Sequence, residues 1–142
     1  MMMSMEIKRF NRYKIHNSTK VAEILQTILN LANHVDRDKE HFFAIGLNSA
    51  NSIIFIELVS LGILNTSLVH PREVFRFAIL KGVAAIIVCH NHPSGSLLPS
   101  TQDKEITEKL VASGKILDIP VLDHVIITSN QHYSFRDEGL MD

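Results

Sequence analysis

A short apolar run that ends in two closely spaced histidines constrains the fold of this chain more than any other segment. Residues 83–88 read Val-Ala-Ala-Ile-Ile-Val, and Cys-His-Asn-His follows directly. A run of this length and β-branched content is typical of a central strand that is buried on both faces of a sheet. The stretch that follows, residues 91–99, is rich in Pro, Ser and Gly and predicts a loop.

The two histidines of this Cys-His-Asn-His motif, His90 and His92, are candidate metal ligands. Side chains two positions apart on an extended backbone point to the same side, so both imidazoles can face one ion. Cys89 and Asn91 should then point the other way. Cys89, the only cysteine, is better explained as a small buried apolar residue than as a ligand. Histidines in a buried strand would be costly without a polar role, and ligation supplies one.

Asp103 is the candidate third ligand. We expect a helix from about Ser100 to Gly114, which puts Asp103 in its first turn and in reach of the strand end. A local explanation stands beside this one: Ser100 can cap the helix, and the helix dipole favours a carboxylate three residues later. Two imidazoles and one carboxylate are a usable set of protein ligands for a catalytic zinc, with a fourth position left for water.

The remaining pattern predicts one mixed α/β domain, of the α+β type, built on a sheet with antiparallel pairs. We expect a polar, partly basic N-terminal arm over residues 1–17 and the domain over 18–142. The basic side chains of the arm could touch phosphates, although a solvated terminus is the simpler account. The predicted helices cover 18–32, 70–82 and 100–114, and the predicted strands cover 42–47, 52–59, 83–88, 119–128 and 133–135.

Composition excludes several classes of protein. A formal net charge of −1 argues against a strongly basic nucleic-acid surface, and a single cysteine excludes an intrachain disulfide and an all-cysteine metal site. No apolar run approaches the ~20 residues of a membrane span, and the first residues lack the apolar core of a signal peptide. We therefore expect a cytoplasmic protein without a membrane partner. His16, His34, His41 and His132 are expected at its surface.

At its candidate ligands the chain resembles the JAMM metalloprotease family, whose domain is also called JAB or MPN. His90-Asn91-His92-Pro93, Ser100 and Asp103 match the family pattern in order and spacing. The surrounding sequence motifs resemble the bacterial RadC family still more closely, over roughly residues 18–142. These motifs are His70-Pro71-Arg72-Glu73-Val74-Phe75, His90-Asn91-His92-Pro93-Ser94-Gly95, Pro99-Ser100 and Asp123-His124. The resemblance implies a JAB/MPN-like mixed sheet with flanking helices and a zinc site at the end of the central strand.

The same resemblance implies roles for individual residues. Zn²⁺ would be bound by His90, His92 and Asp103, with water as the fourth ligand. Ser100 would donate a hydrogen bond in the transition state.

The family also requires a catalytic glutamate at the head of the first sheet strand. Glu40 fits this position. Glu73, in the RadC-like motif that begins at His70, is the alternative candidate for the catalytic glutamate. An exposed charge at a strand edge and a charge in a first helical turn are the alternative explanations for the two. Asp123 and His124 could orient a ligand or form a satisfied buried pair, and Ser94 could line the site or only make the turn.

The implied activity is zinc-dependent hydrolysis of peptide or isopeptide bonds, with a protein or peptide as substrate. The alternative is an inactive metal-binding module that acts in DNA metabolism or on a protein partner. Long RadC proteins carry an N-terminal helix-hairpin-helix region of a DNA-binding type, for which there is no room before residue 18. The chain therefore resembles a short form, and the link to nucleic acid and DNA repair depends on the family name alone.

Overall fold

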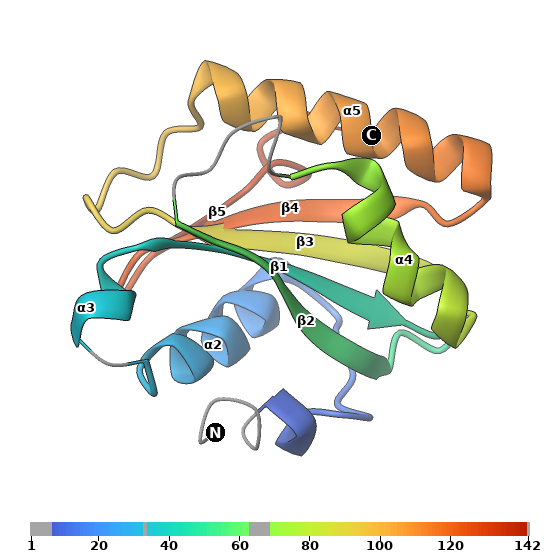
Figure 1. The fold of residues 1–142 in the computed structure, drawn as a ribbon, viewed down its shortest axis with the longest axis horizontal. Helices are drawn as coiled ribbons and strands as arrows, with labels where there is room; N and C mark the ends of the chain where they lie inside the picture. The colour runs from blue at the N-terminus through green and yellow to red at the C-terminus, as the bar shows by residue number, and fades with distance from the viewer. Residues whose placement is uncertain (1–6, 33, 63–68, 142) are drawn as a thin grey trace.

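A computed structural model describes residues 7–32, 34–62 and 69–141, which form one five-stranded sheet with helices on both faces (Figure 1). The helices are α2 Ser18–Leu29, α3 His34–Arg37, α4 Pro71–Lys81 and α5 Thr101–Leu117. The strands are β1 Glu40–Leu47, β2 Ile53–Gly62, β3 Ala85–Asn91, β4 Val121–Ile127 and β5 His132–Ser134. Among these residues, none of the helices has the length and apolar character needed to cross a membrane.

Strand β3 lies at the centre of the sheet, whose order is β2-β1-β3-β4-β5. It pairs antiparallel with β1 and parallel with β4, and all seven of its residues are buried. This confirms the mixed sheet and the central strand that the apolar run predicts. The strand also extends to Asn91, three residues beyond the predicted end, because His90 pairs with both neighbouring strands and Asn91 pairs with β4.

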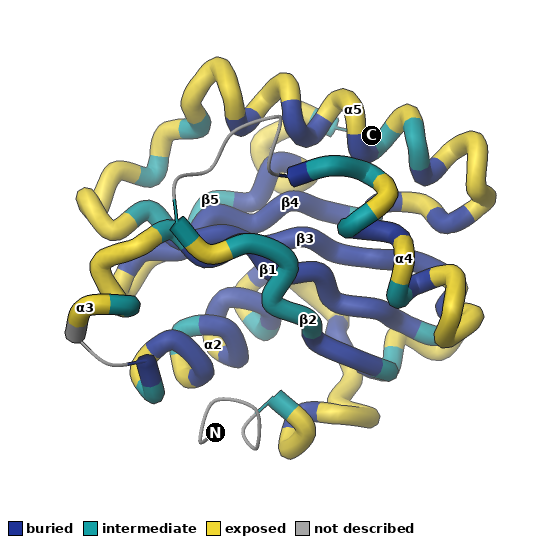
Figure 2. Tube along the Cα trace, viewed as in Figure 1, coloured by how far each residue is buried: buried dark blue, intermediate teal, exposed yellow. Residues whose placement is uncertain are grey.

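The sheet separates α2 on one face from α4 and α5 on the other (Figure 1), and each face has its own apolar core. Against α2 pack the strand residues Phe43, Ile45, Leu47, Ile87, Cys89, Val125 and Ile127. Against α4 and α5 pack Phe42, Ala44, Ile86, Val88 and Val121. Successive strand residues alternate between the two cores, and Figure 2 shows β1, β3 and β4 as a buried layer between helices with exposed outer surfaces. Which face a side chain reaches therefore depends on its place in this alternation.

Helix α5 continues past the predicted end at Gly114 to Leu117. The glycine does not stop the helix but allows a close approach, since a Cβ at Gly114 would lie 2.5 Å from the carbonyl oxygen of Ile119. The helix ends at Asp118, which adopts the left-handed conformation with φ 58°. The prediction was wrong here because glycine is equally typical of a helix end and of tight packing.

The stretch before α2 is more closely packed than a polar arm would be. Phe10 and Ile15 are buried in the core beneath α2, and the N–H of Ile53 donates to the carbonyl of Tyr13 at 2.8 Å. These contacts attach the described part of the stretch to the start of β2. The first six residues of the predicted arm and the side chain of His34 lie outside the described part of the chain.

Candidate metal centre

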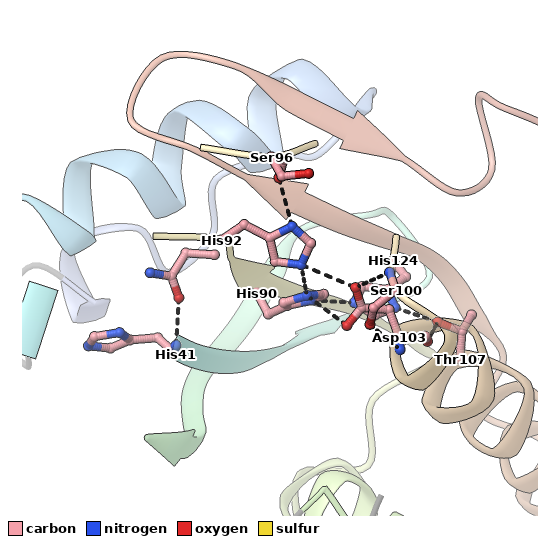
Figure 3. Close-up of polar contacts among 9 residues, drawn as sticks. His41, His90, His92, Ser96, Ser100, Asp103, Thr107 and His124 are labelled. Carbon is pink, nitrogen blue, oxygen red and sulfur yellow. Dashed lines mark hydrogen bonds and ion pairs between the residues drawn. The ribbon is translucent and has the colours of Figure 1, made fainter. Parts of the chain in front are cut away.

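Three potential ligands converge where β3 ends and α5 begins (Figure 3). The Nε2 atom of His90 lies 2.9 Å from Nε2 of His92 and 3.2 Å from a carboxylate oxygen of Asp103. The other carboxylate oxygen lies 3.1 Å from Nε2 of His92. These side chains could hold a metal ion, as their sequence pattern predicts, because two imidazoles and one carboxylate aimed at a common point suit Zn²⁺ or a similar divalent ion.

The carboxylate of Asp103 is held by the first turn of α5. The side chain of Ser100 accepts a hydrogen bond from the N–H of Asp103 at 3.0 Å, and the N–H of Ser100 donates to Asp103 at 2.8 Å. This capping box confirms the local explanation. It does not conflict with a role for Ser100 at the site, because the cap uses an oxygen lone pair and not the hydroxyl proton.

The side chains of Asp103 and His92 each favour the charged form of the other. Burial raises the pKa of Asp103, but the imidazoles of His90 and His92 beside its carboxylate outweigh burial and hold that pKa well below its usual range. The hydrogen bond to Asp103 raises the pKa of His92 against the opposing effect of burial, and the charge of Glu40 adds to the rise. The site therefore favours a carboxylate with a cation beside it, which is the charge pattern of a metal centre.

The two candidate glutamates lie in different places. Glu40, the first residue of β1, lines a hollow of about 310 Å³ together with His92, Ser100 and Asp103. Glu73, on the first turn of α4, pairs with Arg76 at 3.7 Å and lines a separate hollow against Ser113 and neighbouring residues of α5.

Ser113 comes ten residues after Asp103 in α5, and ten residues of helix span ~15 Å. The structure thus brings Glu40, and not Glu73, into a hollow shared with two of the three potential ligands, His92 and Asp103.

The register of β1 on β3 explains why Glu40 reaches the site. Phe42 lies opposite His90 across the antiparallel ladder, with the two rings stacked 6.0 Å apart. Glu40 precedes Phe42 by two residues and so shares its face of the sheet, at the level of His92. The alternation along β1 determines which face of the sheet Glu40 lies on. Only the pairing of two strands about fifty residues apart determines that His92 lies beside it on that face.

Asn91 is a site residue that sequence reasoning missed. Its Oδ1 accepts from the N–H of His41 at 2.5 Å, and its Nδ2 donates to the carbonyl of Lys39 at 3.1 Å. These two bonds flank Glu40 and tie the start of β1 to the end of β3. His41 is 1% exposed, so its predicted place at the surface was wrong, because the same alternation turns it toward the interior.

The remaining candidates divide between the faces of the sheet. His124 lies on the metal side, and its Nε2 is 2.7 Å from Nδ1 of His90. Burial lowers the pKa of His124 well below its ordinary value. Asp123 lies on the opposite face, where it accepts hydrogen bonds from the side chain of Ser134 and from two backbone N–H groups. Ser94 is exposed in the loop and lines the same hollow as Glu40.

Comparisons with known proteins agree with this geometry. A family model described as the RadC-like JAB domain matches residues 15–140. The chain is 49% identical over 106 residues to a UPF0758 protein of Chlorobium chlorochromatii, an alignment that covers 75% of this chain and 48% of that protein. It is 53% identical over 104 residues to a UPF0758 protein of Caldanaerobacter subterraneus, which covers 73% of this chain and 45% of that protein.

A third similar protein aligns over a longer stretch. A UPF0758 protein of Pelodictyon phaeoclathratiforme is 42% identical over 137 residues, which covers 96% of this chain and 62% of that protein. The chain spans about half the length of the curated relatives it matches.

Proposed function

This chain belongs to the RadC-like JAB domain family, and we propose that it is a zinc-dependent hydrolase of peptide or isopeptide bonds. The observation that carries the proposal is the convergence of His90, His92 and Asp103, with Glu40 in the hollow that His92 and Asp103 line. A carboxylate next to an open metal site is the arrangement that hydrolysis with an activated water needs.

His90, His92 and Asp103 would hold the metal. Zinc supplies a Lewis acid and lowers the pKa of water toward ~7, so that a nucleophile is available at neutral pH. The preference for zinc rests on the two imidazole nitrogens, since sites for Mg²⁺ or Ca²⁺ consist of oxygen ligands.

The residues around the ligands would handle the protons and the developing charge. Glu40 would accept the proton of the attacking water and deliver it to the leaving amine. The hydroxyl of Ser100 would donate a hydrogen bond to the carbonyl oxygen of the scissile bond as negative charge develops on it. Asn91 supports the first role, because its two hydrogen bonds hold the backbone on either side of Glu40.

Two variants with the same chemical change test this assignment. The purified chain is loaded with zinc, its metal content is measured, and cleavage of a library of linear and isopeptide-linked peptides is followed by mass spectrometry. We expect Glu40→Gln to lower kcat at least 100-fold while the metal content stays unchanged, in the range that general acid–base catalysis contributes. Glu73→Gln, on α4, should keep the activity of the wild type.

An inactive metal-binding module is the competing function, and the same experiment separates the two. A zinc-loaded protein that cleaves no peptide, together with salt-dependent DNA binding that survives His92→Ala and Glu40→Gln, would replace the hydrolase by that module. A protein that takes up no metal would contradict both.

A further inference from the structure

A series of three hydrogen bonds runs from the potential metal ligand His90 to the backbone of Asp103, which is another potential ligand. We propose that His124 and Thr107 are positioning residues that hold His90 in the neutral tautomer whose Nε2 carries no proton and is available to the metal. This inference rests on the proposed metal site and assigns a role to two residues that do not touch it directly.

The path has three steps (Figure 3). Nδ1 of His90 lies 2.7 Å from Nε2 of His124. Nδ1 of His124 lies 2.5 Å from the hydroxyl oxygen of Thr107. That hydroxyl lies 2.8 Å from the backbone carbonyl of Asp103, one turn earlier in α5. Each of the four residues is buried, so no step of the path is shared with bulk water.

The chemistry of the last step gives the path a direction. A carbonyl oxygen can only accept, and a hydroxyl has one proton, so Thr107 donates to Asp103 and must accept from His124. The proton of His124 is then on Nδ1, and its Nε2 is the acceptor. His90 must therefore donate from Nδ1, and in the neutral ring this leaves its Nε2 without a proton.

The surroundings of His124 keep it in one place. Its side chain is fully buried, its ring is stacked on Phe135 at 4.6 Å and 9°, and the ring of Phe42 meets it edge-on at 5.8 Å. Two aromatic neighbours restrict rotation of the imidazole, so it cannot exchange its partners. Partners of metal-binding histidines set their tautomer and orientation in the same way in other proteins.

The opposite direction has a distinct consequence. If Thr107 donated to His124 instead, His124 would donate to His90, and the proton of His90 would lie on Nε2. That proton would point at Asp103, whose carboxylate is 3.2 Å away, and would have to leave before a metal could bind. The direction of the path therefore decides how well the site is prepared for the ion.

Nitrogen-15 NMR of the metal-free protein at pH 8 reads the tautomers directly. We expect the shifts of His90 and His124 to show protonated Nδ1 and bare Nε2 in both rings. A proton on Nε2 of His90 in the wild type would overturn the inference. Because this measurement needs no metal, it remains decisive even if the chain binds none and the proposed function fails.

A matched pair of variants tests the consequence for binding. Thr107→Val keeps the shape of the side chain but removes the hydroxyl, and Thr107→Ser keeps the hydroxyl. We expect Val to weaken zinc binding about 10- to 100-fold, as loss of a partner of a ligand does elsewhere, and Ser to restore affinity to within a few-fold of the wild type. Zinc affinity is measured by competition with a chelator, and folding of each variant by thermal unfolding without metal.

His124→Phe supplies an independent check, because it keeps the stacking on Phe135 but offers no acceptor to His90. It should lose zinc affinity at least as much as Thr107→Val. Wild-type zinc affinity in folded Thr107→Val would overturn the proposed role, whether or not His124→Phe folds.

Discussion

Two buried aspartates, Asp103 and Asp123, lie on opposite faces of the sheet and differ in their chemistry. Asp103 faces two imidazoles, which hold its pKa well below the usual range although burial opposes this. Asp123 is satisfied by a serine hydroxyl and backbone N–H groups, and burial raises its pKa. Both carboxylates are buried, so the opposite directions of their pKa shifts come from the groups that surround them. A carboxylate becomes a candidate ligand here only where the alternation of the strands has gathered histidines.

The strongest test of this comparison removes the charge of each aspartate in turn. Asp103→Asn should weaken zinc binding by more than the roughly 100-fold that loss of an outer hydrogen-bond partner costs, because it removes a ligand itself. Asp123→Asn should leave zinc affinity unchanged. Chelator competition measures both, and a loss of affinity in Asp123→Asn would mean that the two faces are coupled more closely than their contacts indicate.

The second test concerns stability on the α2 side. Asn91→Ala leaves the N–H of His41 without its partner inside the protein and removes the donor to Lys39. An unsatisfied buried group costs about 1–3 kcal/mol and the lost bond to Lys39 about 1 kcal/mol more, so we expect a loss in the free energy of unfolding of about 2–4 kcal/mol in urea titrations. Asn130→Ala, in the exposed turn before β5, should change stability by less than about 0.5 kcal/mol. Equal effects of the two substitutions would contradict the role given to Asn91.

The third test uses pH. The pKa of His92 is raised in the folded protein, so its contribution to stability is present below the ordinary value of ~6.5 and is lost as pH rises through the raised value. The pKa of Asp103 is lowered, so its contribution is present above ~3.9 and is lost as pH falls. The cluster therefore stabilises the metal-free protein most between about pH 4 and 6.5.

His92→Gln provides the control for this pH dependence. The difference in melting temperature between wild type and variant should be largest inside that window and should shrink above it. Because zinc competes with protons for His92, added zinc should raise the melting temperature of the wild type more at pH 8 than at pH 6. A zinc effect that does not depend on pH would exclude His92 as a ligand.

The smallest effect is expected at Cys89, which belongs to the core beneath α2. Burial raises the pKa of its thiol, so no thiolate is available to a metal at neutral pH. Cys89→Ala should keep zinc stoichiometry and affinity and lower stability by only about 1 kcal/mol, because it removes one small buried group. Thermal unfolding and metal analysis measure the two, and lost zinc would contradict the assignment of Cys89 to the other face.

Much of the fold followed from local patterns. The apolar run predicted the central strand, and His70 with Pro71 predicted the start of α4, where the His70 side chain accepts from the N–H of Arg72. The glycine at 114 misled the prediction of the end of α5, because a contact with Ile119 from outside the helix decides its role. Patterns that report burial or capping are local, whereas close approaches between segments are not.

Sequence by itself determined the potential ligands of this protein. His90 and His92 share a face because they are two apart on a strand, and Asp103 enters the first turn of the helix that follows. Tertiary structure decided which side chains from different strands come into contact. Only the register of β1 on β3 brings Glu40 into the hollow, and only the parallel pairing of β4 sets His124 against His90. The physical reason is that alternation along a strand says which side chains share a face, while strand pairing says which of them meet.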